Sequence, residues 1–132
     1  MKTRRETFNK SERLCSTKII SGLFENGNIF HTSLFKVVWS KSPVPLPFPV
    51  QIAFSVSKKG FRQAVTRNLI KRRMREAYRK NKYPLYEYLS SENRQIVLVV
   101  IMKGNSVADY LTIEKSIKEI LARLIGDIKE KV

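Results

Sequence analysis

The sequence contains very little cysteine and histidine, and this scarcity excludes several kinds of site. Cys15 and His31 are the only residues of their types, so no disulfide can form within the chain. One residue of each type also falls short of the four nitrogen and sulfur ligands of an ordinary zinc site. No glycine-rich phosphate-binding motif is present. The sequence therefore predicts no catalytic residue, no protein-bound metal and no nucleotide cradle.

Long hydrophobic runs are missing as well. The longest apolar stretch, Ile96 to Met102, is far shorter than the roughly 20 residues that span a bilayer. The first residues are basic and have no apolar segment behind them, so we expect no signal peptide and a cytoplasmic protein. A length of 132 residues, 42% of them hydrophobic, predicts a single domain over residues 1–132 with one modest core.

Acidic residues are scarce, and basic residues are concentrated in one part of the chain. The net charge is +15, and residues 58–82 hold eleven basic residues and one acidic residue. We expect residues 1–15 to form an extended basic arm. Charge that is concentrated in this way is typical of a surface that binds phosphates. It indicates a nucleic acid as the partner, with an anionic membrane surface as the competing possibility.

Hydrophobic periodicity predicts an α+β fold in the order helix, strand, strand, helix, strand, helix, with a short extra strand near residues 28–30. The helices are expected at 17–25, at 64–80 and from 112 onward, and the strands at 34–40, 50–57 and 95–102. Ser16 and Thr112 are the expected N-caps of the first and last helices. The proline-rich residues 43–49 predict a loop.

The segment 64–80 predicts an amphipathic helix with two distinct sides. One side carries basic and amide side chains that recur at helical spacing, namely Arg67, Asn68, Lys71, Arg72, Arg75 and Arg79. Ile70, Met74 and Ala77 form a separate apolar side, enough to dock on a sheet. Arginine binds phosphate with two donors and stacks on bases, which favours RNA. A membrane-surface helix needs a broader apolar face with bulky aromatic residues.

The same segment resembles the signature of the protein component of bacterial ribonuclease P, a Ser-Lys-Lys turn followed by Ala-Val-x-Arg-Asn-x-Ile-Lys-Arg-x-x-Arg-Glu-Ala on a helix. The chain matches this pattern at Ser57, Lys58, Lys59, Ala64, Val65, Arg67, Asn68, Ile70, Lys71, Arg72, Arg75, Glu76 and Ala77. Arg13-Leu14 is similar to the Arg-Leu that precedes the family's first helix. The chain departs from the pattern at Leu69, where arginine is common, and at Ile20, where an aromatic residue is frequent. The turn before Ala64 is also one residue longer than the commoner form.

The resemblance implies a two-layer α/β sandwich with a four-stranded sheet and helices at both ends, like the second domain of ribosomal protein S5. It implies a left-handed β-α-β crossover, although general rules of handedness favour a right-handed one. The implied function is an RNA-binding, non-catalytic subunit that assists the catalytic RNA in removing the 5′ leader from precursor tRNA. The implied partners are the ribonuclease P RNA and precursor tRNA, and Mg²⁺ acts at the RNA active site.

The resemblance also implies two sets of site residues. The RNA-binding set is Lys58, Lys59, Arg62, Arg67, Asn68, Lys71, Arg72, Arg75 and Arg79. The leader-cleft set is Ile20, Phe24, Phe35, Gln51, Ala53, Ser55 and Ser57, with Trp39 as an alternative wall to Phe35. In the second set, the small and polar residues of strand 50–57 are expected to form the cleft floor.

Two other functions remain open on the sequence alone. A structural ribosomal protein, or another RNA-binding protein without a role in processing, would share the size and the charge. A DNA-binding helix-turn-helix regulator would need a short helix packed before its recognition helix. Here a strand is expected to end at Ser57, and only a six-residue turn separates it from the basic helix.

Overall fold

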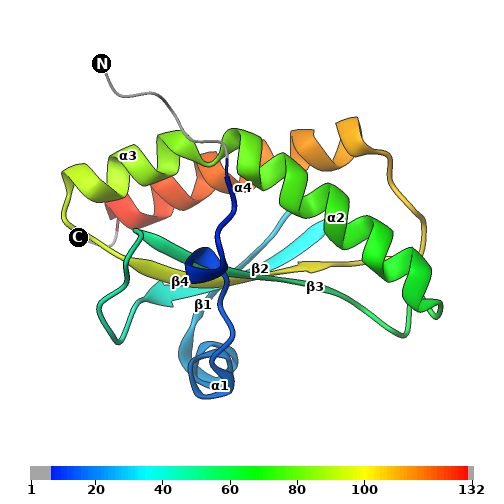
Figure 1. The fold of residues 1–132 in the computed structure, drawn as a ribbon, viewed down its shortest axis with the longest axis horizontal. Coiled ribbons are helices and arrows are strands. Elements are labelled where there is room, and N and C mark those ends of the chain that lie inside the picture. The colour runs from blue at the N-terminus through cyan, green and yellow to red at the C-terminus, as the bar shows by residue number, and fades with distance from the viewer. Residues whose placement is uncertain (1–6, 131–132) are drawn as a thin grey trace.

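The computed structural model describes residues 7–130 and shows a four-stranded sheet with helices on both faces (Figure 1). The elements are a short 3-10 turn η1 (Lys10–Glu12), α1 (Thr17–Asn26), β1 (Asn28–His31), β2 (Phe35–Lys41), β3 (Val50–Val56), α2 (Ala64–Asn81), α3 (Tyr83–Ser91), β4 (Ile96–Met102) and α4 (Tyr110–Glu130). Helices α2, α3 and α4 lie along one face of the sheet, and α1 lies against the other. The predicted two-layer sandwich is thus present, with α1 as a small addition on the second face.

The strands are arranged in the order β1-β2-β4-β3, so the last strand in sequence lies between two earlier ones. The β1–β2 and β2–β4 pairs are antiparallel and the β3–β4 pair is parallel. One row across the sheet runs from Trp39 through Leu98 to Ile52. The parallel pairing confirms the predicted crossover through the helices, whose left-handed sense stays a prediction.

Two hydrophobic clusters lie on the two faces of the sheet. The larger fills the space under α2, α3 and α4, and the smaller lies under α1 and includes Leu14, Leu23 and Val38. Strand β4 contributes alternate residues to both clusters, for example Leu98 to the first and Val99 to the second. A strand that is buried on both faces is expected to be apolar throughout, which explains the continuous run Ile96–Met102.

Helices α1 and α2 form largely as the sequence predicts. The Ser16 hydroxyl accepts a hydrogen bond from the Ile19 amide at 3.2 Å, which makes Ser16 the N-cap of α1. Gly27 ends that helix, and a side chain there would collide with the Leu23 carbonyl oxygen. In α2 the predicted apolar residues Ile70, Met74 and Ala77 are fully buried, together with Tyr78.

Two details of the helices differ from the predictions. Helix α3 was not predicted, although Leu85 and Leu89 lie one turn apart and are both buried. Pro84 lies in its first turn, where proline costs no hydrogen bond. The prediction of Thr112 as the last N-cap is wrong, because Asp109 accepts the Thr112 amide at 2.8 Å and α4 begins at Tyr110.

The N-terminal segment is also more structured than predicted. Residues 1–6 of the predicted arm lie outside the described residues. Residues 7–14 contain η1, a fully buried Glu12, and a parallel bridge from Arg13 to Ile52 at the edge of β3. Residues 7–14 are thus docked on the body of the protein, while a basic arm over residues 1–15 stays a prediction. The docking depends on a set of contacts with residues far away in the sequence.

Candidate nucleic-acid interface

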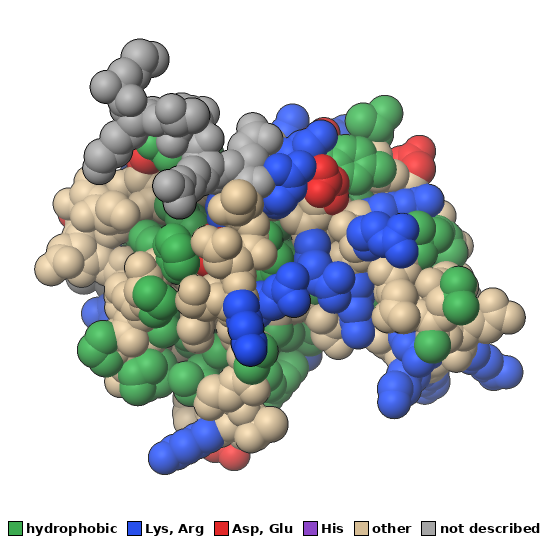
Figure 2. Space-filling view, in the orientation of Figure 1, with side chains coloured by type: hydrophobic (Ala, Val, Ile, Leu, Met, Phe, Trp, Pro, Cys, Tyr) green, Lys and Arg blue, Asp and Glu red, His purple; other side chains and the backbone are tan. Residues whose placement is uncertain are grey.

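The predicted RNA-binding residues lie on α2 and on the turn that precedes it. Figure 2 shows Lys and Arg side chains gathered over this part of the molecule, with few acidic side chains among them. The exposed members are Lys58, Lys59, Arg62, Asn68 and Arg72, and the half-buried members are Arg67, Lys71, Arg75 and Arg79. The structure thus brings the whole set to one region, beside the apolar side that docks on the sheet. Their binding to RNA stays a prediction.

Arg67 is tied to the turn that leads into α2. Its Nη1 atom donates to the carbonyl oxygens of Phe61 and Arg62, both at 2.8 Å. Phe61 is itself buried in the main core, which fixes this end of the turn. Arg67 therefore shapes the turn that carries the exposed basic side chains, in addition to any contact with phosphate.

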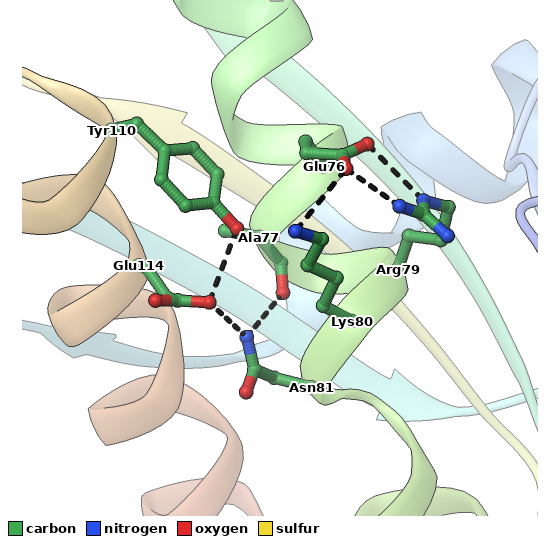
Figure 3. Close-up of polar contacts among 7 residues, drawn as sticks. All are labelled: Glu76, Ala77, Arg79, Lys80, Asn81, Tyr110 and Glu114. Carbon is green, nitrogen blue, oxygen red and sulfur yellow. Dashed lines mark hydrogen bonds and ion pairs between the residues drawn. The ribbon is translucent and has the colours of Figure 1, made fainter. Parts of the chain in front are cut away.

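Glu76, the only acidic residue of α2, compensates part of the charge at the C-terminal end of the helix. Its carboxylate lies 2.6 Å from Nη2 of Arg79 and 3.8 Å from Nζ of Lys80 (Figure 3). The hydrogen bond from Arg79 holds the pKa of Glu76 below its ordinary value. Arg79 therefore adds less net charge to the basic side than the sequence alone suggests.

One flank of α2 is closed by α4. Arg73 Nη1 donates to the Ala108 carbonyl oxygen at 2.6 Å. Asn81 donates to the Ala77 carbonyl oxygen at 2.8 Å and to the Glu114 carboxylate at 3.0 Å (Figure 3). The first contact occupies a basic side chain that would otherwise extend the basic surface, and the contact of Asn81 with Glu114 joins α2 to α4.

The other flank of α2 lies beside the N-terminal segment. The pKa of Arg75 is lowered by burial and by the charge of Arg13, whose guanidinium lies over the Phe8 ring, 5.3 Å from its centroid. Arg13 was not in the predicted RNA-binding set. The Arg-Leu pair of the family resemblance includes Arg13 and could have pointed to it. The position of Arg13 beside α2, however, depends on contacts between residues some 70 positions apart in the sequence.

The predicted cleft floor lies on β3 and faces the α1 side of the sheet. Ala53 packs with Ile20 of α1 in the smaller cluster, and Gln51 and Ser55 share its face and are half-buried. Phe24 is about half exposed on α1. Gln51 donates through its amide to the Ser11 carbonyl oxygen at 3.1 Å, which links the floor to the N-terminal segment. Ser57, half-buried, follows the end of β3.

Two predicted cleft residues are placed elsewhere. Phe35 and Trp39 are buried in the larger cluster, on the face that α2, α3 and α4 cover. The prediction that either of them forms a cleft wall is therefore wrong. Both belong to β2, where Phe35, Val37 and Trp39 share one face and Val38 lies on the other, and the spacing alone does not say which layer covers each face.

Residues 7–130 contain no group of three or more His, Cys, Asp and Glu side chains arranged to hold a metal ion. Within the same range, none of the helices combines the length and the hydrophobicity that a membrane crossing requires.

Comparisons with known proteins agree with this geometry. A family model described as Ribonuclease P matches residues 8–125. A protein of Porphyromonas gingivalis named ribonuclease P protein component is 32% identical over 119 residues, which cover 90% of this chain and 87% of the relative. A protein of the same name from Petrotoga mobilis is 31% identical and covers 90% and 96%.

Solved structures show the same fold. The ribonuclease P protein of Staphylococcus aureus superposes with a TM-score of 0.70 at 22% identity, covering 87% of this chain and 96% of that one. The Thermotoga maritima protein gives a TM-score of 0.66 at 23% identity, covering 85% and 96%. With the family model and the sequence relatives, this likeness shows that the chain belongs to the ribonuclease P protein component family.

Proposed function

We propose that this chain is the RNA-binding subunit of ribonuclease P, and that it assists the catalytic RNA in removing the 5′ leader from precursor tRNA. Membership of the family supports this proposal, because the relatives are named as protein components of that enzyme. In this role the protein binds and orients RNA. The RNA subunit, with the Mg²⁺ that it would hold, would supply the chemistry of cleavage.

The observation that carries the proposal is the division of α2 into two sides. Ile70, Met74 and Ala77 are fully buried against the sheet, while Lys71, Arg72 and Arg75 follow the outer side of the same helix. An 18-residue helix is about 27 Å long, which is enough to follow several phosphates of a folded RNA. The buried side keeps the helix rigid, so the cationic groups are held in place before the RNA binds.

The face of β3 toward α1 supports the second part of the proposal, the binding of an extended leader. Gln51, Ala53 and Ser55 project from a regular strand and have small or uncharged side chains. An extended single strand of RNA can approach such a face closely. Phe24, which is half exposed on α1 nearby, offers a ring on which a base can stack.

A reconstituted cleavage assay tests the proposal. The full chain would be mixed with ribonuclease P RNA made in vitro and with precursor tRNA that carries a labelled 5′ leader, at low Mg²⁺ concentration. We expect the protein to raise kcat/KM of the RNA for precursor tRNA, and we expect the protein alone to cleave nothing. Cleavage by the protein alone, or no effect on the RNA, would contradict the proposal.

A second measurement separates this function from that of a structural ribosomal protein. The chain would be crosslinked to RNA in cells, and the bound RNA would be sequenced. We expect ribonuclease P RNA and tRNA precursors to be enriched over ribosomal RNA. Enrichment of ribosomal RNA alone would favour the structural role.

A further inference from the structure

The N-terminal segment 7–14 is fastened to the body of the protein by a buried ion pair. The side chains of Glu12 and Lys82 are 1% and 7% exposed, and the Lys82 ammonium contacts the Glu12 carboxylate directly. The Tyr86 hydroxyl donates to the same carboxylate at 2.7 Å. The Asn9 amide donates to its second oxygen, also at 2.7 Å. A buried carboxylate is costly unless it is paired and hydrogen-bonded, and Glu12 meets both conditions.

Aromatic and backbone contacts hold the rest of the segment. The ring of Phe8 packs edge-on against Phe54 of β3 and Tyr78 of α2, with centroids 6.0 Å and 5.6 Å away. The Leu14 amide donates to the Ile52 carbonyl oxygen at 2.9 Å. The segment is therefore seated across the edge of β3 and against α2, as Figure 1 shows in blue.

This seating determines the position of Arg13. Its guanidinium lies over the Phe8 ring, 5.3 Å from the centroid. Phe8 in turn contacts Tyr78, which lies one helical turn beyond Arg75 on α2. Among residues 7–130, no carboxylate lies within ion-pair distance of Arg13 or Arg75. Arg13 therefore lies beside the Phe8–Tyr78 contact, about one turn along α2 from Arg75, and its charge contributes to lowering the pKa of Arg75. No anion of the described chain compensates either group.

We propose that Arg13 and Arg75 together bind one phosphodiester of the RNA, and that Glu12 is the positioning residue that keeps Arg13 in place. An anion between two guanidinium groups relieves their repulsion and accepts hydrogen bonds from both. The basic surface then extends from α2 onto the N-terminal segment. This inference rests on the proposed function, since it names a further phosphate contact of the same interface.

A purely structural role for Glu12 predicts a different result. The variant Glu12→Gln raises the net charge of the protein by one, so general electrostatics predicts tighter RNA binding. The proposal predicts weaker binding, because Arg13 loses its fixed position when the pair with Lys82 is broken. The direction of the change therefore distinguishes the two explanations.

The experiment measures binding of the full chain to ribonuclease P RNA with bound precursor tRNA at several salt concentrations. The variants are Arg13→Ala, Glu12→Gln and the double variant. Lys115→Ala, on the exposed face of α4, is the control that removes an equal charge elsewhere. We expect Arg13→Ala to weaken binding and to reduce the slope of log K against log salt by about one unit, with no such change for Lys115→Ala. In the Arg13→Ala background, Glu12→Gln should no longer weaken binding, because the side chain that Glu12 positions is absent and only the gain of one positive charge remains.

The proposal is overturned if Arg13→Ala behaves like Lys115→Ala, or if Glu12→Gln strengthens binding. If Glu12→Gln does not fold, Arg13→Ala decides alone, because the Arg13 side chain is exposed and its removal leaves the buried pair intact. If Arg72→Ala changes the slope of log K against log salt and Arg13→Ala does not, the phosphate site at Arg13 and Arg75 is rejected while the proposed function stands. Failure of the unmodified chain to bind the RNA would reject the proposed function itself.

Discussion

The backbone of Gly104 lies directly against Gly60, so that a Cβ atom on Gly60 would come within 2.0 Å of the Gly104 carbonyl oxygen. This contact joins the turn before α2 to the turn after β4. Only a residue without a side chain allows two backbones to approach so closely. The position of the basic turn thus depends on the opposite end of the β-α-β unit.

Replacement of Gly60 by alanine should force the two turns apart. We expect Gly60→Ala to lower the free energy of unfolding by about 1–3 kcal/mol, as measured by urea denaturation. The matched control is Gly126→Ala, because a Cβ there meets nothing and the residue lies within α4. That control should gain up to about 1 kcal/mol. Equal stability of the two variants would show that the turns move apart freely.

Arg72 and Arg67 should respond differently to truncation. Arg72 is exposed, so Arg72→Ala should change stability by less than about 0.5 kcal/mol while lowering the salt slope of RNA binding by about one unit. Arg67→Ala also removes two hydrogen bonds to the turn and should cost about 1 kcal/mol in addition. Denaturation and binding titrations on the same samples separate the two effects. An unchanged slope for both variants would remove these side chains from the set of phosphate contacts.

Glu76 should oppose RNA binding while adding little to stability. Glu76→Gln releases Arg79 and Lys80 from the carboxylate, so we expect tighter RNA binding and a steeper salt dependence. The pKa of Glu76 is lowered from 4.5, so its stabilising effect is present above that value and is lost as the pH falls below it. Because the pair is well exposed, this effect should not exceed about 0.5 kcal/mol. Weaker RNA binding by Glu76→Gln would contradict the expectation.

The buried pair of Glu12 and Lys82 should contribute far more to the free energy of unfolding than the exposed pair of Glu76 and Arg79. We expect Lys82→Met to lower the free energy of unfolding by about 3–5 kcal/mol, because the Glu12 carboxylate stays buried without its cation. The double variant Glu12→Leu with Lys82→Met should recover much of this loss. Chemical denaturation of both variants measures the difference. A double variant as unstable as the single one would show that the pair matters for packing rather than charge.

Two buried tyrosines should make the protein sensitive to alkali. Burial raises the pKa of both Tyr78 and Tyr86 far above 10, and their hydroxyl groups lie 2.9 Å apart. In the unfolded chain these phenols ionise near 10, so stability should be complete below that pH and should fall as the pH rises above it. Urea midpoints at about pH 9 and about pH 11 test this. Tyr78→Phe, which removes one such phenol, should show a weaker fall.

The sequence predicted the elements that follow a clear periodic pattern. The apolar residues Ile70, Met74 and Ala77 of α2 recur at helical spacing, and the structure buries all three. The alternation in β3 is equally clear. In β2 the spacing places Phe35, Val37 and Trp39 on one face, but it does not say which layer of helices covers that face.

The remaining differences arise from contacts between distant residues. Glu12 looks like one more surface charge until Lys82 and Tyr86 are brought to it by the fold. The same holds for Arg13, whose neighbour Arg75 lies on α2. Helix α3 escapes prediction for a local reason. Pro84 suggests a break in a helix, but it lies in the first turn, where proline is tolerated.

The strand order β1-β2-β4-β3 has a consequence for the growing chain on the ribosome. Strands β2 and β3 are made early, yet neither pairs with the other, because β4 fills the place between them. Until residues 96–102 leave the exit tunnel, β1–β2 is the only one of the strand pairs within residues 7–130 that can form. A nascent chain that already carries the whole basic helix therefore lacks the central strand of the sheet on which that helix docks. Release of residues 96–102 from the tunnel should complete the sheet and seat this helix in one late step.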